Sequence, residues 1–266
     1  MAKNKDSIQN IVIVALSLCL VAAIVVSTVA VGLKPTREAN KELDRAKNIL
    51  IAAGLYEQGK TSNNEIDGLF EQFEIRLVSL KEGKLLSVSE AEALGIDPVT
   101  YEQKSAAKDP AMSRDLDVSE DLASISRQAD YSVVYLLKTE GQIDRVVIPI
   151  HGYGLWSTLY GYIALNRDMN TVSGITFYEH QETAGLGGEV DNPAWKSGWV
   201  GKEIFTDGGN VALSVIKGSV DPSNRNAKHQ IDGLSGATLT SRGVQNLIQF
   251  WMGDAGFGPI LKELKG

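Results

Sequence analysis

A turn rich in hydroxyl side chains, residues 232–241 (Asp-Gly-Leu-Ser-Gly-Ala-Thr-Leu-Thr-Ser), leads directly into an amphipathic segment. Apolar residues recur there at helical spacing, at Val244, Leu247, Ile248 and Trp251, which predicts a helix with one buried face. Thr240 or Ser241 stands where the N-cap of that helix belongs. A helix N-terminus offers free N–H groups and the positive end of a dipole, so it can bind a phosphate. On spacing alone, the alternative is a plain glycine turn with a Ser/Thr cap.

Two other glycine-rich loops carry residues suited to ligand binding. Residues 151–158 (His-Gly-Tyr-Gly-Leu-Trp-Ser-Thr) combine glycines, which permit close backbone approach, with Trp156, whose ring offers a flat apolar face. Residues 180–195 contain several more glycines in a short space. The alternatives are a core tryptophan beside a tight turn in the first loop and a flexible lid without a ligand in the second.

The composition predicts a globular, acidic protein of one or two domains. The 266 residues are 43% hydrophobic and 22% charged, with a net charge of −7, and nucleic-acid binding, which needs a basic patch, is disfavoured. The one cysteine, Cys19, lies in the most apolar stretch and cannot form an internal disulfide. The three histidines lack ligand spacing, so no metal site is expected.

The N-terminal region predicts a single-pass membrane anchor. After a short tail, residues 1–10, the run 11–33 contains no charge and exceeds the roughly 20 residues that a membrane-spanning helix needs. A cleaved signal peptide is the alternative, but its apolar core is only about 7–15 residues long. Lys3 and Lys5 precede the run and five cations follow it within residues 34–47. Charge counting alone therefore places the following domain in the cytoplasm.

The remaining chain predicts an α+β domain, residues 56–266, joined to the anchor by a connector helix over residues 34–55. A helix is expected over 64–73, capped by Asn63 or Asn64, and a hairpin turn at 81–84 between strands 76–80 and 85–88. Residues 89–128 are polar and predict a surface excursion with short helical pieces, the first beginning at Ser89. Further strands are expected at 131–137, 145–150, 159–165, 172–178 and 211–216. Short turns between most of them predict an antiparallel sheet with helices packed to one side.

The turn at 232–241 resembles the signature D-x-x-[ST]-G-A-[ST]-x-[ST] of covalent FMN-binding domains. In that family a flavin transferase esterifies the second hydroxyl residue to the FMN phosphate, and the match implies that this residue is Thr238. The resemblance also implies that Gly236 lets the transferase approach and that Asp232 helps to orient metal or phosphate. The remaining implied site residues of the signature are Ser235, Ala237 and Thr240.

Residues 182–187 (Glu-Thr-Ala-Gly-Leu-Gly) resemble the E-T-x-G-L-G loop of the same family. The resemblance implies that Leu186, together with Trp156, forms the apolar walls of the flavin ring site. Glu182, Thr183 and Gly185 are implied polar or backbone contacts. Ala184 stands where proline is common, a departure that does not touch the assigned chemistry. Trp195, Trp199 and Trp251 are expected to be core residues.

The anchor, both loops and the longer run Gly-Gly-Glu-Val-Asp-Asn-Pro-Ala-Trp, residues 187–195, are similar to the C-subunit family of bacterial sodium-translocating NADH:quinone oxidoreductases. The resemblance covers nearly the whole chain. It implies a translocase subunit in the inner membrane, with its domain on the outer, periplasmic face, in conflict with charge counting. It also implies covalent FMN, maturation by a flavin transferase, and electron relay between other subunits of a complex that oxidises NADH and reduces ubiquinone.

No catalytic residue, NADH site or quinone site is expected on this chain, because no G-x-G-x-x-G precedes a βαβ unit and the anchor carries no ionisable residue. Two alternatives remain open. One is the equivalent flavinylated subunit of the ferredoxin-linked Rnf complex, usually a shorter chain. The other is a membrane-anchored flavin-binding sensor without a relay role.

Overall fold

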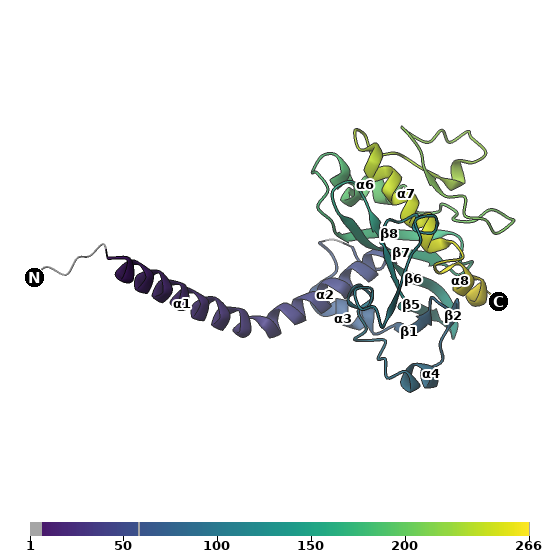
Figure 1. Ribbon diagram of the computed structural model, residues 1–266. Helices are drawn as coiled ribbons and strands as arrows, with labels where there is room; N and C mark the ends of the chain where they lie inside the picture. Colours follow the sequence, from purple (N-terminus) through teal and green to yellow (C-terminus); the bar gives the residue numbers. More distant parts are fainter. Residues whose placement is uncertain (1–6, 58, 266) are drawn as a thin grey trace, which may run out of the picture. The chain divides into compact units, whose positions relative to one another are not determined.

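The computed structural model describes residues 7–57 and 59–265, so residues 1–6 of the predicted tail lie outside the described chain. The chain divides into two compact units, residues 1–45 and 46–266 (Figure 1). In the first unit, α1 (Ile8–Gly32) begins after its N-cap Ser7, and α2 (Lys34–Ala52) follows directly. Among the described residues, α1 is the one helix long and apolar enough to cross a membrane.

Two polar side chains in α1 already satisfy their hydrogen bonds inside the helix. Ser17 Oγ donates to the Ile13 carbonyl at 2.7 Å, and Thr28 Oγ1 donates to the Ile24 carbonyl at 2.8 Å. Such back-bonding suits an apolar surrounding, where an unpaired hydroxyl is costly. Neither hydroxyl therefore requires water.

The second unit is built on a six-stranded antiparallel sheet in the order β2-β1-β5-β6-β7-β8. The strands are β1 (Phe73–Ser79), β2 (Lys84–Leu85), β5 (Tyr131–Thr139), β6 (Gln142–Tyr153), β7 (Thr158–Asn166) and β8 (Val172–Glu179). The predicted α+β class is confirmed, as are the four strands from residue 131 to 178 and the hairpin at 81–84. Smaller pieces are β3 (Ser113–Asp115) with β4 (Arg127–Ala129), and β9 (Ser214–Val215) with β10 (Gln230–Ile231).

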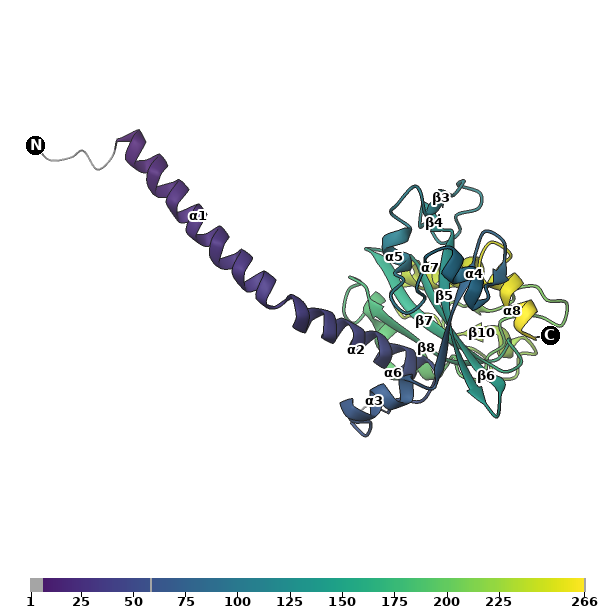
Figure 2. The same ribbon diagram turned by 90° about the horizontal axis from the view of Figure 1, so that it is seen from below.

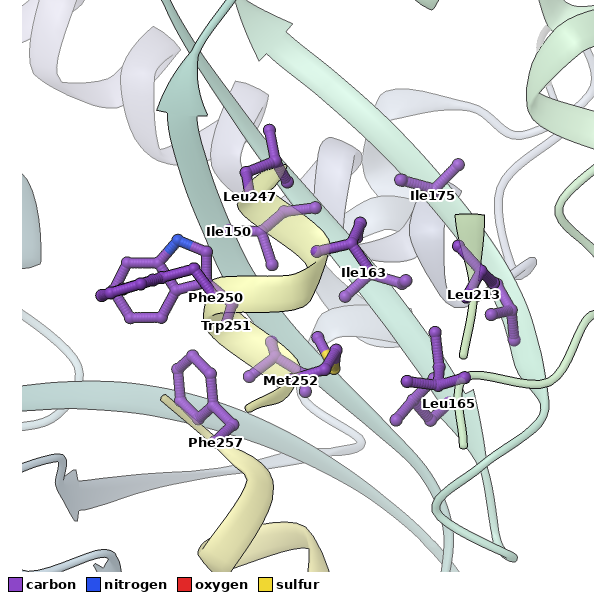
Figure 3. Packing of buried hydrophobic residues seen from close by; sticks show 14 of the residues in the cluster. Ile150, Ile163, Leu165, Ile175, Leu213, Leu247, Phe250, Trp251, Met252 and Phe257 are labelled. Atoms are coloured by element: carbon purple, nitrogen blue, oxygen red, sulfur yellow. The ribbon is translucent and has the colours of Figure 1, made fainter. Parts of the chain in front are cut away.

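Helices cover both faces of the sheet (Figures 1 and 2). The prediction that they pack to one side is therefore wrong. On β8, Ile175 points into the cluster that packs under α7 (Thr238–Met252), together with Ile163 and Leu247 (Figure 3). Its neighbour Thr176 points the other way and meets the end of α2, where Thr176 Oγ1 bonds Asn48 at 3.3 Å. The other helices are α3 (Asn63–Phe70), α4 (Val88–Ala93), α5 (Gln103–Ala106), α6 (Pro193–Ser197), α8 (Gly258–Lys265), η1 (Gly187–Asp191) and η2 (Ala227–His229).

Several predicted boundaries are wrong, each because another residue satisfies the chain end better. Ser62 and Ser87, rather than the residues predicted, form the capping boxes that begin α3 and α4. The strand predicted at 211–216 shortens to β9, which pairs in parallel with β10 outside the main sheet. Residues before it turn back instead, since the N–H groups of residues 212 and 213 both bond the Ile204 carbonyl.

The register of β6, β7 and β8 brings the two glycine-rich loops to one end of the sheet. β6 and β7 pair without interruption as far as Tyr153 opposite Thr158, so residues 154–157 form the closing loop. The irregular pairing of β8 places Glu179 opposite Tyr160. Residues 180–188 therefore leave the sheet beside that loop, and the first turn of α7 meets both.

Candidate functional site

Thr238 is the first residue of α7 and its side chain is exposed. The helix follows a four-residue turn in which the Ala237 N–H bonds the Leu234 carbonyl at 3.1 Å. Gly236, third in the turn, has φ +72°, a conformation that favours glycine. The first N–H bonded back to the turn is that of Ser241, so the N–H groups of residues 238–240 have no intrahelical partner. An exposed hydroxyl thus stands beside free donors at a positive helix end.

The predicted N-cap role of Thr240 and Ser241 is wrong, because α7 begins earlier than the apolar stripe indicates. Both hydroxyls point inward and bond other segments. Ser241 Oγ accepts the Leu234 N–H at 3.0 Å, and Thr240 Oγ1 donates to Glu182 Oε2 at 2.7 Å. The N-cap position is Ala237, which makes no side-chain cap. The helix end therefore retains donors that a capping side chain would have used.

Glu182 is a buried carboxylate whose oxygens are occupied by the protein. Oε1 accepts the N–H groups of Leu155 at 3.0 Å, Trp156 at 2.9 Å and Ser157 at 3.4 Å, while Oε2 accepts the Thr240 hydroxyl. Burial alone raises the pKa of Glu182, but the Thr240 hydroxyl and the loop N–H groups outweigh it and lower the pKa. The side chain is therefore ionised at neutral pH and joins the first loop to α7.

Glycines are required where the loops and α7 meet. A Cβ on Gly154 would stand 2.7 Å from Glu182 Oε1, and one on Gly187 would stand 2.6 Å from Oε2 and 2.5 Å from Thr240 Oγ1. On α7, a Cβ on Gly243 would collide with the Tyr153 carbonyl. Since a side chain at any of these positions would force the segments apart, the glycines set how closely the loops approach the helix.

Apolar side chains remain exposed around Thr238. Trp156 is 64% exposed and Leu186 44% exposed, and the Leu186 Cδ2 lies 2.9 Å from where a Cβ on Gly236 would stand. Leu155 and Leu239 are exposed as well. We call Leu155, Trp156, Leu186 and Leu239 the apolar rim. Exposed large apolar side chains grouped in this way mark a binding surface more often than scattered ones do.

The other predicted site residues lie around this centre in different settings. Ser235 is exposed, and Ala237 is buried beneath the turn. The Thr183 carbonyl accepts the N–H groups of Leu186 and Gly188 within its own loop, and Gly185 has φ +74°. The Asp232 carboxylate accepts the Val220 N–H at 2.8 Å, and its carbonyl accepts Trp195 Nε1 at 2.8 Å. Of the tryptophans expected in the core, Trp199 and Trp251 are fully buried and Trp195 is partly buried.

Residues 154–253 match the family described as FMN-binding domain. Over 98% of both chains, the sequence is 49% identical to the C subunit of the Na(+)-translocating NADH-quinone reductase of Pseudomonas aeruginosa. The corresponding protein of Vibrio anguillarum is 44% identical, over 100% of this chain and 98% of its own. The chain belongs to the C-subunit family. The resemblance noted in the sequence is thereby confirmed at the level of the family.

Solved structures of this family support the fold. The crystal structure of Shewanella oneidensis NqrC, 35% identical, matches with a TM-score of 0.73 over 85% of this chain and 99% of that chain. The corresponding Na(+)-translocating NADH-quinone reductase protein of Parabacteroides distasonis, 24% identical, matches with a TM-score of 0.63 over 86% and 96% and shows the fold alone.

The residues present fit FMN. An exposed hydroxyl and free helix N–H groups suit a phosphate, and the apolar rim suits a flat ring system. In the described chain, no cluster of His, Cys, Asp and Glu side chains is placed to hold a metal. Leu155, Leu239 and Gly187 were not predicted from the sequence. Leu239 could have been found, because it falls outside the apolar stripe of its own helix.

Proposed function

We propose that this chain carries FMN covalently on Thr238 and relays electrons within a membrane-bound, Na⁺-translocating NADH:ubiquinone oxidoreductase. The observation that carries the proposal is the exposed Thr238 hydroxyl on the first residue of α7, inside the matched FMN-binding domain and next to the apolar rim. Two relatives covering nearly the whole chain are named as subunits of such a reductase. A flavin transferase and the other subunits of the complex are the proposed partners.

The chain contributes binding, orientation and a tether. In the proposed attachment, Thr238 Oγ1 forms an ester bond to the FMN phosphorus and loses its proton, while the transferase supplies the activated flavin nucleotide. The free N–H groups of residues 238–240 stabilise the phosphate charge. Trp156 and Leu186 flank the ring, and Gly236 keeps the backbone beside Thr238 accessible. FMN supplies the electron-transfer chemistry when bound.

The proposed arrangement in the membrane places α1 across the bacterial inner membrane and the domain, residues 56–266, on the periplasmic side. The uncharged α1 supports the anchor, and membership of the C-subunit family supports the side despite the cations that follow α1. Sodium and substrate sites are assigned to the other subunits. A reporter fused to the C-terminus tests the side: periplasmic alkaline phosphatase should be active there, and a cytoplasmic reporter active in its place would reverse the orientation.

Intact-mass analysis after co-expression with a flavin transferase tests the attachment. The wild-type chain should gain the mass of FMN less water, and Thr238→Ala should gain nothing. Thr238→Ser, which keeps a hydroxyl, should retain some attachment. Ser235→Ala is the matched control, since it removes an exposed hydroxyl from the same turn and should leave attachment intact. Full attachment in Thr238→Ala would refute the assignment.

Rapid-mixing spectroscopy on the assembled complex tests the relay role. The flavin on this chain should be reduced after NADH is added and reoxidised by ubiquinone within one turnover. In the complex carrying Thr238→Ala, electron flow to ubiquinone should stop while NADH still reduces cofactors upstream. A flavin that responds only over many turnovers would instead indicate a sensor.

A further inference from the structure

Glu182 is enclosed by the protein to an extent that leaves it unsuited to bind a ligand. Its carboxylate accepts hydrogen bonds from the N–H groups of residues 155–157 and from Thr240 Oγ1. The close approach of Gly154 to one oxygen and of Gly187 to the other closes the remaining space. The side chain is only 8% exposed. Its oxygens therefore bind protein donors.

The same carboxylate connects three segments that are far apart in the sequence. Each segment carries one residue of the proposed flavin site: Trp156 in the first loop, Leu186 in the second, and Thr238 on α7. The bond to Thr240 spans 58 residues and the bond to Trp156 spans 26. Removing the carboxylate would leave buried donors in two of these segments without a partner, a costly change for each.

The charge on Glu182 is balanced by dipoles and by no cation. Among the described residues, no lysine, arginine or histidine forms an ion pair with Glu182. Glu182's own N–H donates to Nδ1 of the nearest histidine, His180, at 3.2 Å, so that nitrogen is the unprotonated one. A fixed negative charge in a low-dielectric setting acts strongly on nearby charge.

We propose that Glu182 is a positioning residue of the flavin site, and that its fixed negative charge lowers the reduction potential of the FMN held at Thr238. This inference rests on the proposed function, since it concerns the flavin that Thr238 would carry. An added electron meets a like charge near the ring, so the oxidised form is favoured. The assignment replaces the expected direct contact between Glu182 and the flavin.

Two substitutions in the full-length protein, co-expressed with the transferase, separate charge from position. Glu182→Gln keeps the shape: its carbonyl oxygen can accept the loop N–H groups, and its amide oxygen or nitrogen can meet Thr240 Oγ1. We expect wild-type flavin mass and thermal stability, but a higher midpoint potential. Glu182→Ala should also raise the potential, lower the melting temperature, accelerate hydrogen exchange at residues 155–157 and slow flavin incorporation several-fold.

Matched controls separate the charge effect from the positioning effect. Glu189→Gln removes one charge from the same loop, at a carboxylate that bonds Asn192, and should shift the potential less than Glu182→Gln. Thr240→Val should reproduce part of the faster exchange, while Thr240→Ser should not. A wild-type potential in Glu182→Gln would overturn the charge effect, and wild-type exchange in Glu182→Ala would overturn the positioning role. Absence of flavin mass from the wild-type chain would refute the proposed function instead, and the exchange measurements would still test positioning.

Discussion

The two ends of α7 present opposite environments on one helix. At its first turn, Thr238 and Leu239 are exposed, and Leu239 belongs to no core cluster. Three turns later Trp251 is fully buried, donates Nε1–H to the His151 carbonyl at 2.6 Å, and packs against Phe250 and Phe257 (Figure 3). The buried end fixes the helix on the sheet, so the open end can present a hydroxyl in a defined place without being packed itself.

Between these ends lies a boundary only two residues wide. Thr238 is exposed, whereas Thr240 and Ser241 are buried and bonded to Glu182 and Leu234. Substitutions at the buried end should therefore change stability, and substitutions at the open end should change flavin chemistry.

The largest effect on stability is expected for Trp251→Ala. It removes a fully buried indole and leaves a cavity, so the free energy of unfolding should fall by about 3–5 kcal/mol. Leu239→Ala, on the same helix but 54% exposed, should change it by less than about 0.5 kcal/mol. Denaturant unfolding of both variants measures the difference, and comparable losses would contradict the contrast between the two ends.

Acid should destabilise the buried end through His151. Burial lowers the pKa of His151 to about 4, from 6.5. The unfolded chain then binds the proton first, so stability is complete above about pH 6.5 and is lost as the pH falls towards 4, by up to about 3 kcal/mol. His151→Phe, which keeps an aromatic ring against Tyr160 and Trp251, should flatten melting temperature against pH in that window. The lowered pKa of Glu182 acts in the same direction at lower pH and would remain.

Ser241→Ala should cost about 1–3 kcal/mol, because the buried Leu234 N–H loses its acceptor. Thr238→Ala, three residues earlier, should leave the stability of the flavin-free protein nearly unchanged, because the Thr238 side chain is exposed. Thermal unfolding of both flavin-free proteins compares them. A large loss in Thr238→Ala would show that the first turn is structural after all.

The smallest effect on stability is expected at the apolar rim. Trp156→Ala and Leu186→Ala remove exposed side chains, so melting temperatures should hardly move. The flavin absorption or midpoint potential should shift while the attached mass stays intact. An unchanged spectrum and potential in both variants would exclude these residues as walls of the ring site.

Local patterns were sufficient for part of this structure. The period-two strands from residue 131 to 178, the stripe on α7 and the glycine turn before it are short-range signals, and the structure agrees with them. The start of α7 was misplaced because the stripe begins at Val244, whereas the helix begins where the Gly236 turn ends. Likewise the strand at 211–216 was overextended, because backbone bonds to Ile204 compete with strand pairing.

The amino-acid sequence alone determined the apolar anchor, the position of the hydroxyl-rich turn and the family, because these depend on neighbouring residues and on motif spelling. Only the tertiary structure decided which hydroxyl faces outward and what Glu182 binds. The reason is physical: the partners of Glu182 lie in segments 26 and 58 residues away, brought together by sheet register and by glycines that admit close packing. No local pattern encodes such contacts.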